Sequence, residues 1–139
     1  MARILVSASP EPSAIVERIL ARHELTCAET IVVAEQCLCE KTFDLIVCTI
    51  AFDESRMFDL LRLAKSTPEW KRIPFVVARV RLYILRSASV LRSTAFTCGA
   101  LGAEAFLDIA DYTKSPEREM REAIERFLQP RNETPLALS

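Results

Sequence analysis

The chain has 139 residues and a formal net charge of −1; half of its residues are hydrophobic and 27% are charged. This length fits one domain with a substantial core, and the near-neutral charge excludes a global basic field that would attract nucleic acid. No apolar run approaches the roughly 20 residues of a membrane span, and the first residues lack a secretory leader pattern. Together with five irregularly spaced cysteines, which do not form a disulfide framework, this predicts a cytoplasmic domain.

Short apolar runs alternate with helical patterns along the whole chain, which is typical of a parallel sheet with crossover helices. The run 44–48 is the strongest strand, because its apolar residues are continuous, as expected when helices cover both faces. In chain order, we predict a strand over 4–6, a helix over 14–20, a strand over 25–28, a helix over 31–40, a strand over 44–48, a helix over 58–67, a strand over 75–78, a helix over 82–98, a strand over 105–107 and a helix over 116–128.

Helix-start residues and apolar faces refine these elements. Ser13 is the expected N-cap of the first helix, and Ser115, followed by Pro116, that of the last. In the helix over 31–40 the apolar pattern turns Val33 and Cys37 toward the core, with Ala34 and Leu38 as further inward candidates.

Five strands and five helices in strict alternation predict an α/β fold. Right-handed crossovers give a flavodoxin-like, doubly wound five-stranded parallel sheet of order 2-1-3-4-5, with any site at the carboxyl ends of the strands. We expect one domain over 1–129 and a disordered tail over 130–139. The only two glycines, Gly99 and Gly102, leave no phosphate-binding loop, so no nucleotide or flavin cofactor is expected.

Four segments carry a more specific pattern. They are Phe43–Cys48 at the third strand, Phe58–Arg62 at the start of the third helix, Thr67–Val77 leading into the fourth strand, and Gly102–Leu107 at the fifth strand, the last with the form Gly-Ala-x-x-aromatic-Leu. In this order and at this spacing they resemble the receiver domain of two-component response regulators over nearly the whole chain. The resemblance implies the receiver fold and a part in bacterial signal transduction.

Receivers transfer phosphate to an aspartate after strand three. Two acidic residues after strand one help to hold Mg²⁺, while a hydroxyl after strand four and a lysine after strand five contact the phosphoryl group. The resemblance places these roles on Ala8, Ser9, Thr49, Arg79 and Ile109. None of these residues fits its role, since a neutral hydroxyl needs an adjacent base to become a nucleophile. We therefore expect a degenerate site with no phosphotransfer, no other enzyme activity, no metal and no cofactor.

Two acidic residues, Asp53 and Glu54, follow Thr49 closely and leave two interpretations open. They form either a displaced acidic site paired with Arg79, or a solvated loop with a carboxylate at a helix start.

The cysteines and the single histidine offer little further chemistry. Cys37 and Cys39 are two residues apart, so on a helix they point about 200° away from each other and do not share one metal ion easily. We interpret the cysteines as small packing residues, with one surface thiol. His23 is expected to interact with the end of the first helix.

From Arg79 to Gly102 the chain is about two helical turns longer than the resemblance leads us to expect, and the apolar set of its helical segment 82–98 is wider than one core-facing stripe. It forms either a well-buried helix or an exposed apolar patch that docks a partner. In receivers, helix four, strand five and helix five form the usual signalling and dimer face. The interface candidates are Tyr83, Leu91, Phe96, Phe106 and Tyr112.

These observations lead to two hypotheses. The first is a non-phosphorylatable, stand-alone pseudo-receiver that acts through a protein partner or a homodimer on this face. The alternative is a small-anion or redox sensor that uses the altered pocket at the strand ends. Arginines between Arg79 and Arg92 suit an acidic protein partner, and neither nucleic acid nor a membrane is an expected partner.

Overall fold

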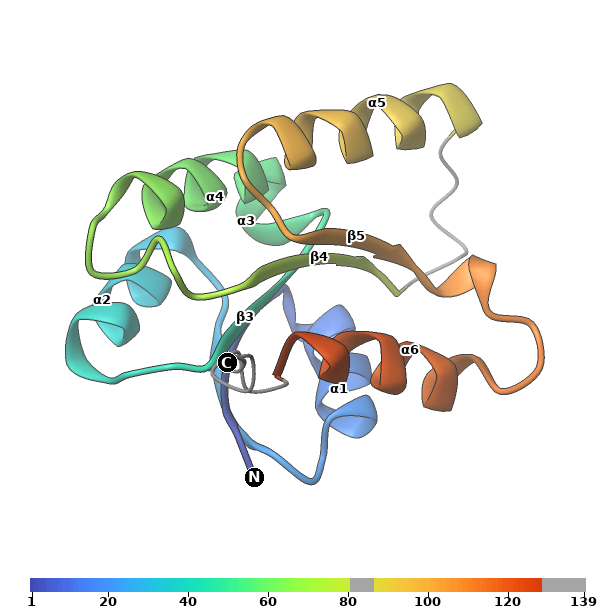
Figure 1. Ribbon diagram of the computed structural model, residues 1–139, viewed down its shortest axis with the longest axis horizontal. Coiled ribbons are helices and arrows are strands. Elements are labelled where there is room, and N and C mark those ends of the chain that lie inside the picture. The colour runs from blue at the N-terminus through green and yellow to red at the C-terminus, as the bar shows by residue number, and fades with distance from the viewer. Residues whose placement is uncertain (81–86, 129–139) are drawn as a thin grey trace, which may run out of the picture.

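A five-stranded parallel sheet lies between two layers of helices (Figure 1) in the structure, a computed structural model that describes residues 1–80 and 87–128. The strand order is β2-β1-β3-β4-β5, and every neighbouring pair is parallel. This confirms the predicted flavodoxin-like, doubly wound sheet. The strands are β1 (Arg3–Ser7), β2 (Glu24–Ala28), β3 (Leu45–Thr49), β4 (Phe75–Arg79) and β5 (Ala105–Asp108).

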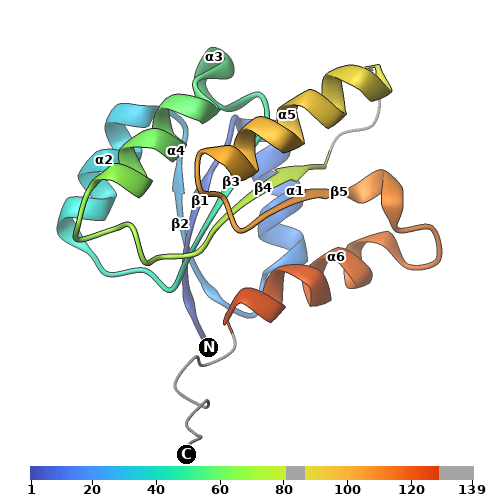
Figure 2. The same ribbon diagram turned by 45° about the horizontal axis from the view of Figure 1, so that its top comes forward.

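Helices cover both faces of this sheet (Figures 1 and 2). One face carries α1 (Pro10–Ile19) and α6 (Pro116–Glu125), and the other carries α2 (Ile31–Glu40), α4 (Met57–Ser66) and α5 (Ala88–Ala100). These five correspond to the five predicted helices. Two short turns among the described residues were not predicted, α3 (Phe52–Ser55) and η1 (Ile109–Asp111), and the end of the predicted last helix is the 3₁₀ turn η2 (Arg126–Leu128).

Alternate residues of the central strands enter two halves of the core. Leu5 and Ile46 pack toward α2, α4 and α5, while Val6 and Val47 pack toward α1 and α6. All four side chains are fully buried. The continuous apolar runs of β1, β3 and β4 follow from this two-sided burial, which supplies the main driving force for folding.

Two sequence predictions about helices α1 and α2 are wrong in detail. Helix α1 begins at Pro10 with Ser9 as its N-cap, because prolines fit a first turn whose N–H groups have no partner in the helix. Ser13 is instead buried within α1, where its hydroxyl donates to Glu17. On α2, Val33 is exposed and its inward prediction is wrong, whereas the candidates Ala34 and Leu38 do face inward, together with Ile31 at helical spacing.

The ends of the last two helices are defined by specific contacts. Ser87 caps α5 by accepting a hydrogen bond from the Val90 N–H at 3.2 Å, so the described helix begins at Ala88, and the predicted helical residues 82–86 lie outside the described residues. The predicted N-cap Ser115 does precede α6, but its hydroxyl makes no capping bond. The carboxylate of Glu119 reaches back instead, to the Ser115 N–H at 2.6 Å. The predicted tail 130–139 also lies outside the described residues.

Ion pairs join α1 to α6 on one face of the sheet. Arg18 binds Glu117 through its Nε at 3.0 Å, and Arg22 binds Glu125 through its Nε at 2.9 Å. His23 lies just beyond α1 and does not interact with the end of that helix through its ring, as the sequence had suggested. Its Nδ1 accepts from the Ala2 N–H at 3.1 Å, so the ring is assigned a proton on Nε2, which donates to Glu125 at 2.7 Å.

The contacts of Glu125 with Arg22 and His23 make the free energy of unfolding depend on pH. Hydrogen bonds from Arg22 and then from His23 hold the pKa of the Glu125 carboxyl below its ordinary value. A carboxyl whose folded pKa is lowered stabilises the fold above its unfolded pKa of about 4.3 and loses this effect as the pH falls through the folded pKa. We expect Glu125→Gln to lower the free energy of unfolding by about 1 kcal/mol at pH 7, with the difference shrinking below about pH 4.

Urea denaturation followed by circular dichroism at several pH values measures this difference. Glu122→Gln is the matched control, because Glu122 is exposed on the same helix. If Glu125→Gln lowered the free energy of unfolding equally at pH 3 and pH 7, the stabilisation would not come from the ionised carboxylate.

Among residues 1–80 and 87–128, no helix has the length and apolar character that crossing a bilayer requires.

Candidate functional site

The carboxyl ends of β1, β3, β4 and β5 form one edge of the sheet, and the five positions that the resemblance assigns to the site lie along it. Strand register places them on consecutive neighbours: Ser7 pairs with Cys48, Thr49 with Ala78, and Arg79 with Asp108. The structure therefore brings the predicted positions to the same edge. Ala8, Thr49, Arg79 and Ile109 are buried and Ser9 is half-buried.

Carboxylates are missing where the family's magnesium ligands and phosphate acceptor would lie. Ala8 and Ser9 follow β1, and Thr49 ends β3. Mg²⁺ requires hard oxygen ligands, mainly carboxylates and waters, and a methyl group and two neutral hydroxyls do not supply them. In the part of the chain that the structure describes, no three His, Cys, Asp or Glu side chains are arranged to hold a metal ion. These residues do not fit the family's metal.

The Thr49 side chain is a poor nucleophile in this position. It is 2% exposed, and within the described ranges its hydroxyl has no hydrogen-bond partner. The neighbouring hydroxyl of Ser7 is in the same situation. A hydroxyl attacks a phosphoryl group only when an adjacent base removes its proton, and none of the described residues is hydrogen-bonded to either hydroxyl as such a base.

Arg79, at the position of the family's hydroxyl, forms an ion pair with Asp108, the residue that precedes the lysine position Ile109. Arg79 Nη1 lies 3.0 Å from both carboxylate oxygens of Asp108, and the two side chains are 8% and 13% exposed. The pair links the ends of β4 and β5, which are in register at these two residues. Asp108 Oδ1 also accepts from the Ala110 N–H at 2.9 Å and so starts the turn η1.

Sequence reasoning missed Asp108, although a signal was present. The expected lysine position is Ile109, so Asp108 is the last strand residue before it and faces the opposite way. Pairing the ends of the two predicted strands would have placed it beside Arg79.

Asp53 and Glu54 do not form a displaced acidic site with Arg79. The Asp53 carboxylate accepts from the Ile31 N–H at 2.8 Å, at the start of α2, where a negative charge is favourable. Both residues of the pair have positive φ, 46° and 53°, a left-handed conformation that costs non-glycine residues energy. This corrects the first interpretation: the loop supports α2, and Arg79 pairs with Asp108.

The thiols are unsuited to redox chemistry at this edge. Cys48 and Cys98 are fully buried. Burial raises the pKa of the Cys48 thiol well above its ordinary value, and it raises the pKa of Cys98 to about 11. Reactive cysteines need the opposite shift, because the thiolate is the nucleophile. Cys37 is half-buried against the core and Cys39 is exposed, as expected for positions two residues apart on a helix.

The interface candidates differ in exposure. Phe96, on α5, is 78% exposed, whereas Leu91 on the same helix is half-buried. Phe106 packs partly against the core beneath α5, and Tyr112 packs partly against the α1–α6 half of the core. Tyr83 lies outside the described residues.

Helix α5 is loosely attached to the sheet compared with the other helices. Cys98 is its one fully buried residue, and Val90 is 45% exposed. The predicted alternative of a well-buried helix is therefore wrong for residues 88–100, where most of the helix surface remains open.

No protein-family model and no curated protein matches the sequence. The structure, however, is similar to solved receiver domains. One is the receiver domain of a signal transduction histidine kinase from Syntrophus aciditrophicus, with a TM-score of 0.72, 20% identity, and coverage of 100% of this chain and 98% of that one. Another is a response regulator from Hahella chejuensis, with a TM-score of 0.72, 20% identity, and coverage of 95% and 98%.

A third similar structure contains a magnesium ion. The receiver domain of a sensor histidine kinase from Pseudomonas aeruginosa PAO1, with magnesium in its active-site cleft, has a TM-score of 0.71, 14% identity, and coverage of 93% of this chain and 98% of that one. The strand order, the helix layers and these neighbours agree. The chain has the fold of response-regulator receiver domains.

Proposed function

We propose that the chain is a pseudo-receiver, which acts in signal transduction through protein contacts and does not undergo aspartyl phosphotransfer. The observation that carries this proposal is the buried ion pair that Arg79, the residue at the family's hydroxyl position, forms with Asp108, next to the lysine position. An arginine whose charge is paired with Asp108 is less available for an incoming phosphate. With Thr49 as the residue at the acceptor position, the fold is retained while the chemistry is absent.

The proposed contact surface is the face formed by α5, β5 and α6. Phe96 is an exposed aromatic residue on this face, and aromatic residues are enriched at protein interfaces. The long α5 exposes more apolar surface than a helix that only covers a sheet. The occupant is a protein partner or a second copy of the chain.

Light scattering of wild type and Phe96→Glu distinguishes these two occupants. A dimer that the substitution dissociates identifies self-association, and a monomer in both cases identifies a different protein. Val32→Glu is the matched control, since Val32 is 60% exposed on α2, away from this face.

The absence of phosphotransfer is the direct test of the proposal. We expect no phosphoryl adduct by intact mass spectrometry after incubation with acetyl phosphate and Mg²⁺, because the carboxylates that bind the metal and accept the phosphate are absent. Stoichiometric, Mg²⁺-dependent phosphorylation of the wild-type chain would overturn the proposal.

A positive control restores the family's residues at the five positions, with Ala8→Asp, Ser9→Asp, Thr49→Asp, Arg79→Thr and Ile109→Lys. Intact mass is the right measurement for both proteins. The single tryptophan, Trp70, precedes β4 and so lies at the opposite end of the strands, where it would not report on metal binding.

The alternative of a small-anion or redox sensor receives less support. An anion site needs an available positive charge, but Arg79 is paired with Asp108. A redox sensor needs an accessible thiol of low pKa, whereas burial raises the pKa of both Cys48 and Cys98. A small anion retained in native mass spectrometry, and lost in Arg79→Met, would favour this alternative.

A further inference from the structure

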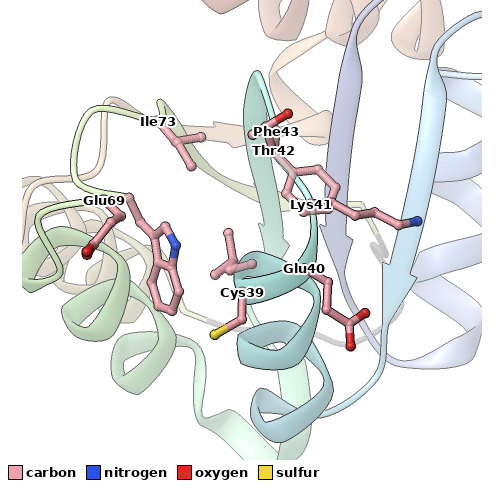
Figure 3. A pocket seen from close by; sticks show the side chains of 9 residues that line it. Cys39, Glu40, Lys41, Thr42, Phe43, Glu69 and Ile73 are labelled. Atoms are coloured by element: carbon pink, nitrogen blue, oxygen red, sulfur yellow. The ribbon is translucent and has the colours of Figure 1, made fainter.

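A groove of about 640 Å³ lies at the opposite end of the sheet from the degenerate site (Figure 3). It is formed by the last turn of α2 with the residues that follow it, and by the loop between α4 and β4. Its volume is in the range of ligand-binding clefts. Neither the strand-end positions nor the proposed α5–β5–α6 face contributes to it.

The floor of the groove is apolar and aromatic. Leu38 and Phe43 are buried beneath it, and Trp70 and Ile73 are partly buried along it. Trp70 therefore keeps part of its indole accessible in the groove. Such a surface accepts an aliphatic or aromatic side chain, and an indole face also attracts a cation.

The rim of the groove is acidic. Figure 3 shows Glu69 and Glu40 on opposite sides of the groove, with their carboxylates pointing outward from it. Lys41 also lines it, but its ammonium is directed away, to the Thr26 hydroxyl on β2 at 3.4 Å. Helix α2 ends here with Glu40 and no basic residue in its last turn, so the negative end of the helix dipole adds to the two carboxylates.

We propose that this groove docks a basic, apolar segment of a partner protein. An aliphatic or aromatic side chain would enter between Phe43 and Trp70, and flanking lysine or arginine residues would reach Glu40 and Glu69. A peptide segment suits this arrangement, because a peptide can carry an apolar side chain in its centre and a basic residue on each side, one for Glu40 and one for Glu69. Lys71 and Arg72 follow in the same loop but do not line the groove.

Two blocked peptides without tryptophan test the proposal: Ser-Arg-Leu-Phe-Arg-Ser and its acidic twin Ser-Glu-Leu-Phe-Glu-Ser. Trp70 is the only tryptophan, so its fluorescence reports on the groove alone. We expect the basic peptide to change this fluorescence saturably and to slow alkylation of Cys39, whose thiol lies in the groove. The acidic twin should bind at least about tenfold more weakly, since both rim charges then repel it.

Variants of the rim complete the test. Glu40→Gln with Glu69→Gln should weaken the basic peptide by about fivefold or more, whereas Glu35→Gln, an exposed position of α2 outside the groove, should not. Equal binding of both peptides, no response of Trp70, or an equal effect of Glu35→Gln would each overturn the proposal. So would a Trp70 signal that changes on dilution without peptide, which would indicate a second copy as the occupant.

This groove does not depend on the proposed function. Phe96→Glu should leave binding of the basic peptide unchanged, because Phe96 lies on α5, away from the groove. Phosphorylation of the wild-type chain would overturn the pseudo-receiver proposal without affecting the peptide result, so the two failures are distinguishable.

Discussion

Arg79→Met and Asp108→Asn should each lower the free energy of unfolding by about 3 kcal/mol, because each leaves its partner charged, buried and without the ion pair. Asn at 108 keeps an oxygen that can accept from the Ala110 N–H, so the start of η1 is not lost with the charge. The double variant should be no less stable than either single variant, which corresponds to a coupling energy of about 3 kcal/mol.

Urea denaturation of the wild type, the two single variants and the double variant provides the full double-mutant cycle. The pair Arg56 and Asp59 is a matched control, since it lies on the surface and both side chains are about half exposed. Its coupling should be below about 1 kcal/mol. If the Arg79–Asp108 coupling were as small as this, the pair would not be a fixed part of the strand ends, and the observation that carries the proposed function would fail.

The coupling energy between Arg79 and Asp108 also bears on the proposed function. A strongly coupled buried pair is held in one arrangement, because separating the two side chains leaves each charge buried and uncompensated. A large coupling energy therefore supports a chain whose strand ends are set during folding. It also disfavours the anion-sensor alternative, because an anion would have to separate Arg79 from Asp108 and leave that carboxylate buried.

The sheet could be predicted from sequence because its signals are local. The continuous apolar runs of β1, β3 and β4 reflect burial on both faces, and the alternation of strands with helices leaves few topologies for a doubly wound sheet. The degenerate positions were also predictable as a set. Thr49 and Arg79 end neighbouring strands, and the carboxyl ends of parallel strands meet at one edge.

The features that sequence did not predict depend on contacts between distant residues. Val33 is as apolar as its neighbours, and only the packing of α2 on the sheet decides that Val33 is exposed. Asp53 has the appearance of a loop residue until the start of α2 is placed beside it, 22 positions earlier in the chain. The groove likewise combines residues near Leu38 with residues near Trp70, which no local pattern connects.

Substitutions of two phenylalanines distinguish a residue needed for folding from a residue of the proposed contact face. Phe75→Ala should lower the free energy of unfolding by about 3–5 kcal/mol, because Phe75 is fully buried at the start of β4 and its removal leaves a cavity between the central strands and the α2–α4–α5 layer. Phe96→Ala removes the same atoms from a side chain that is 78% exposed, so its cost should be within about 0.5 kcal/mol. Urea denaturation measures both.

In contrast to its small effect on stability, Phe96→Ala should have a clear effect on partner binding or self-association. Phe96→Ala should weaken association through the α5–β5–α6 face, because a truncated interface aromatic commonly costs 1 kcal/mol or more, about fivefold in the dissociation constant. A stability loss for Phe96→Ala as large as that of Phe75→Ala would mean that Phe96 belongs to the core in solution, and the exposed aromatic on which the contact face depends would not exist. A stable Phe96→Ala variant with weakened association would instead assign the residue to recognition, because the fold does not need it.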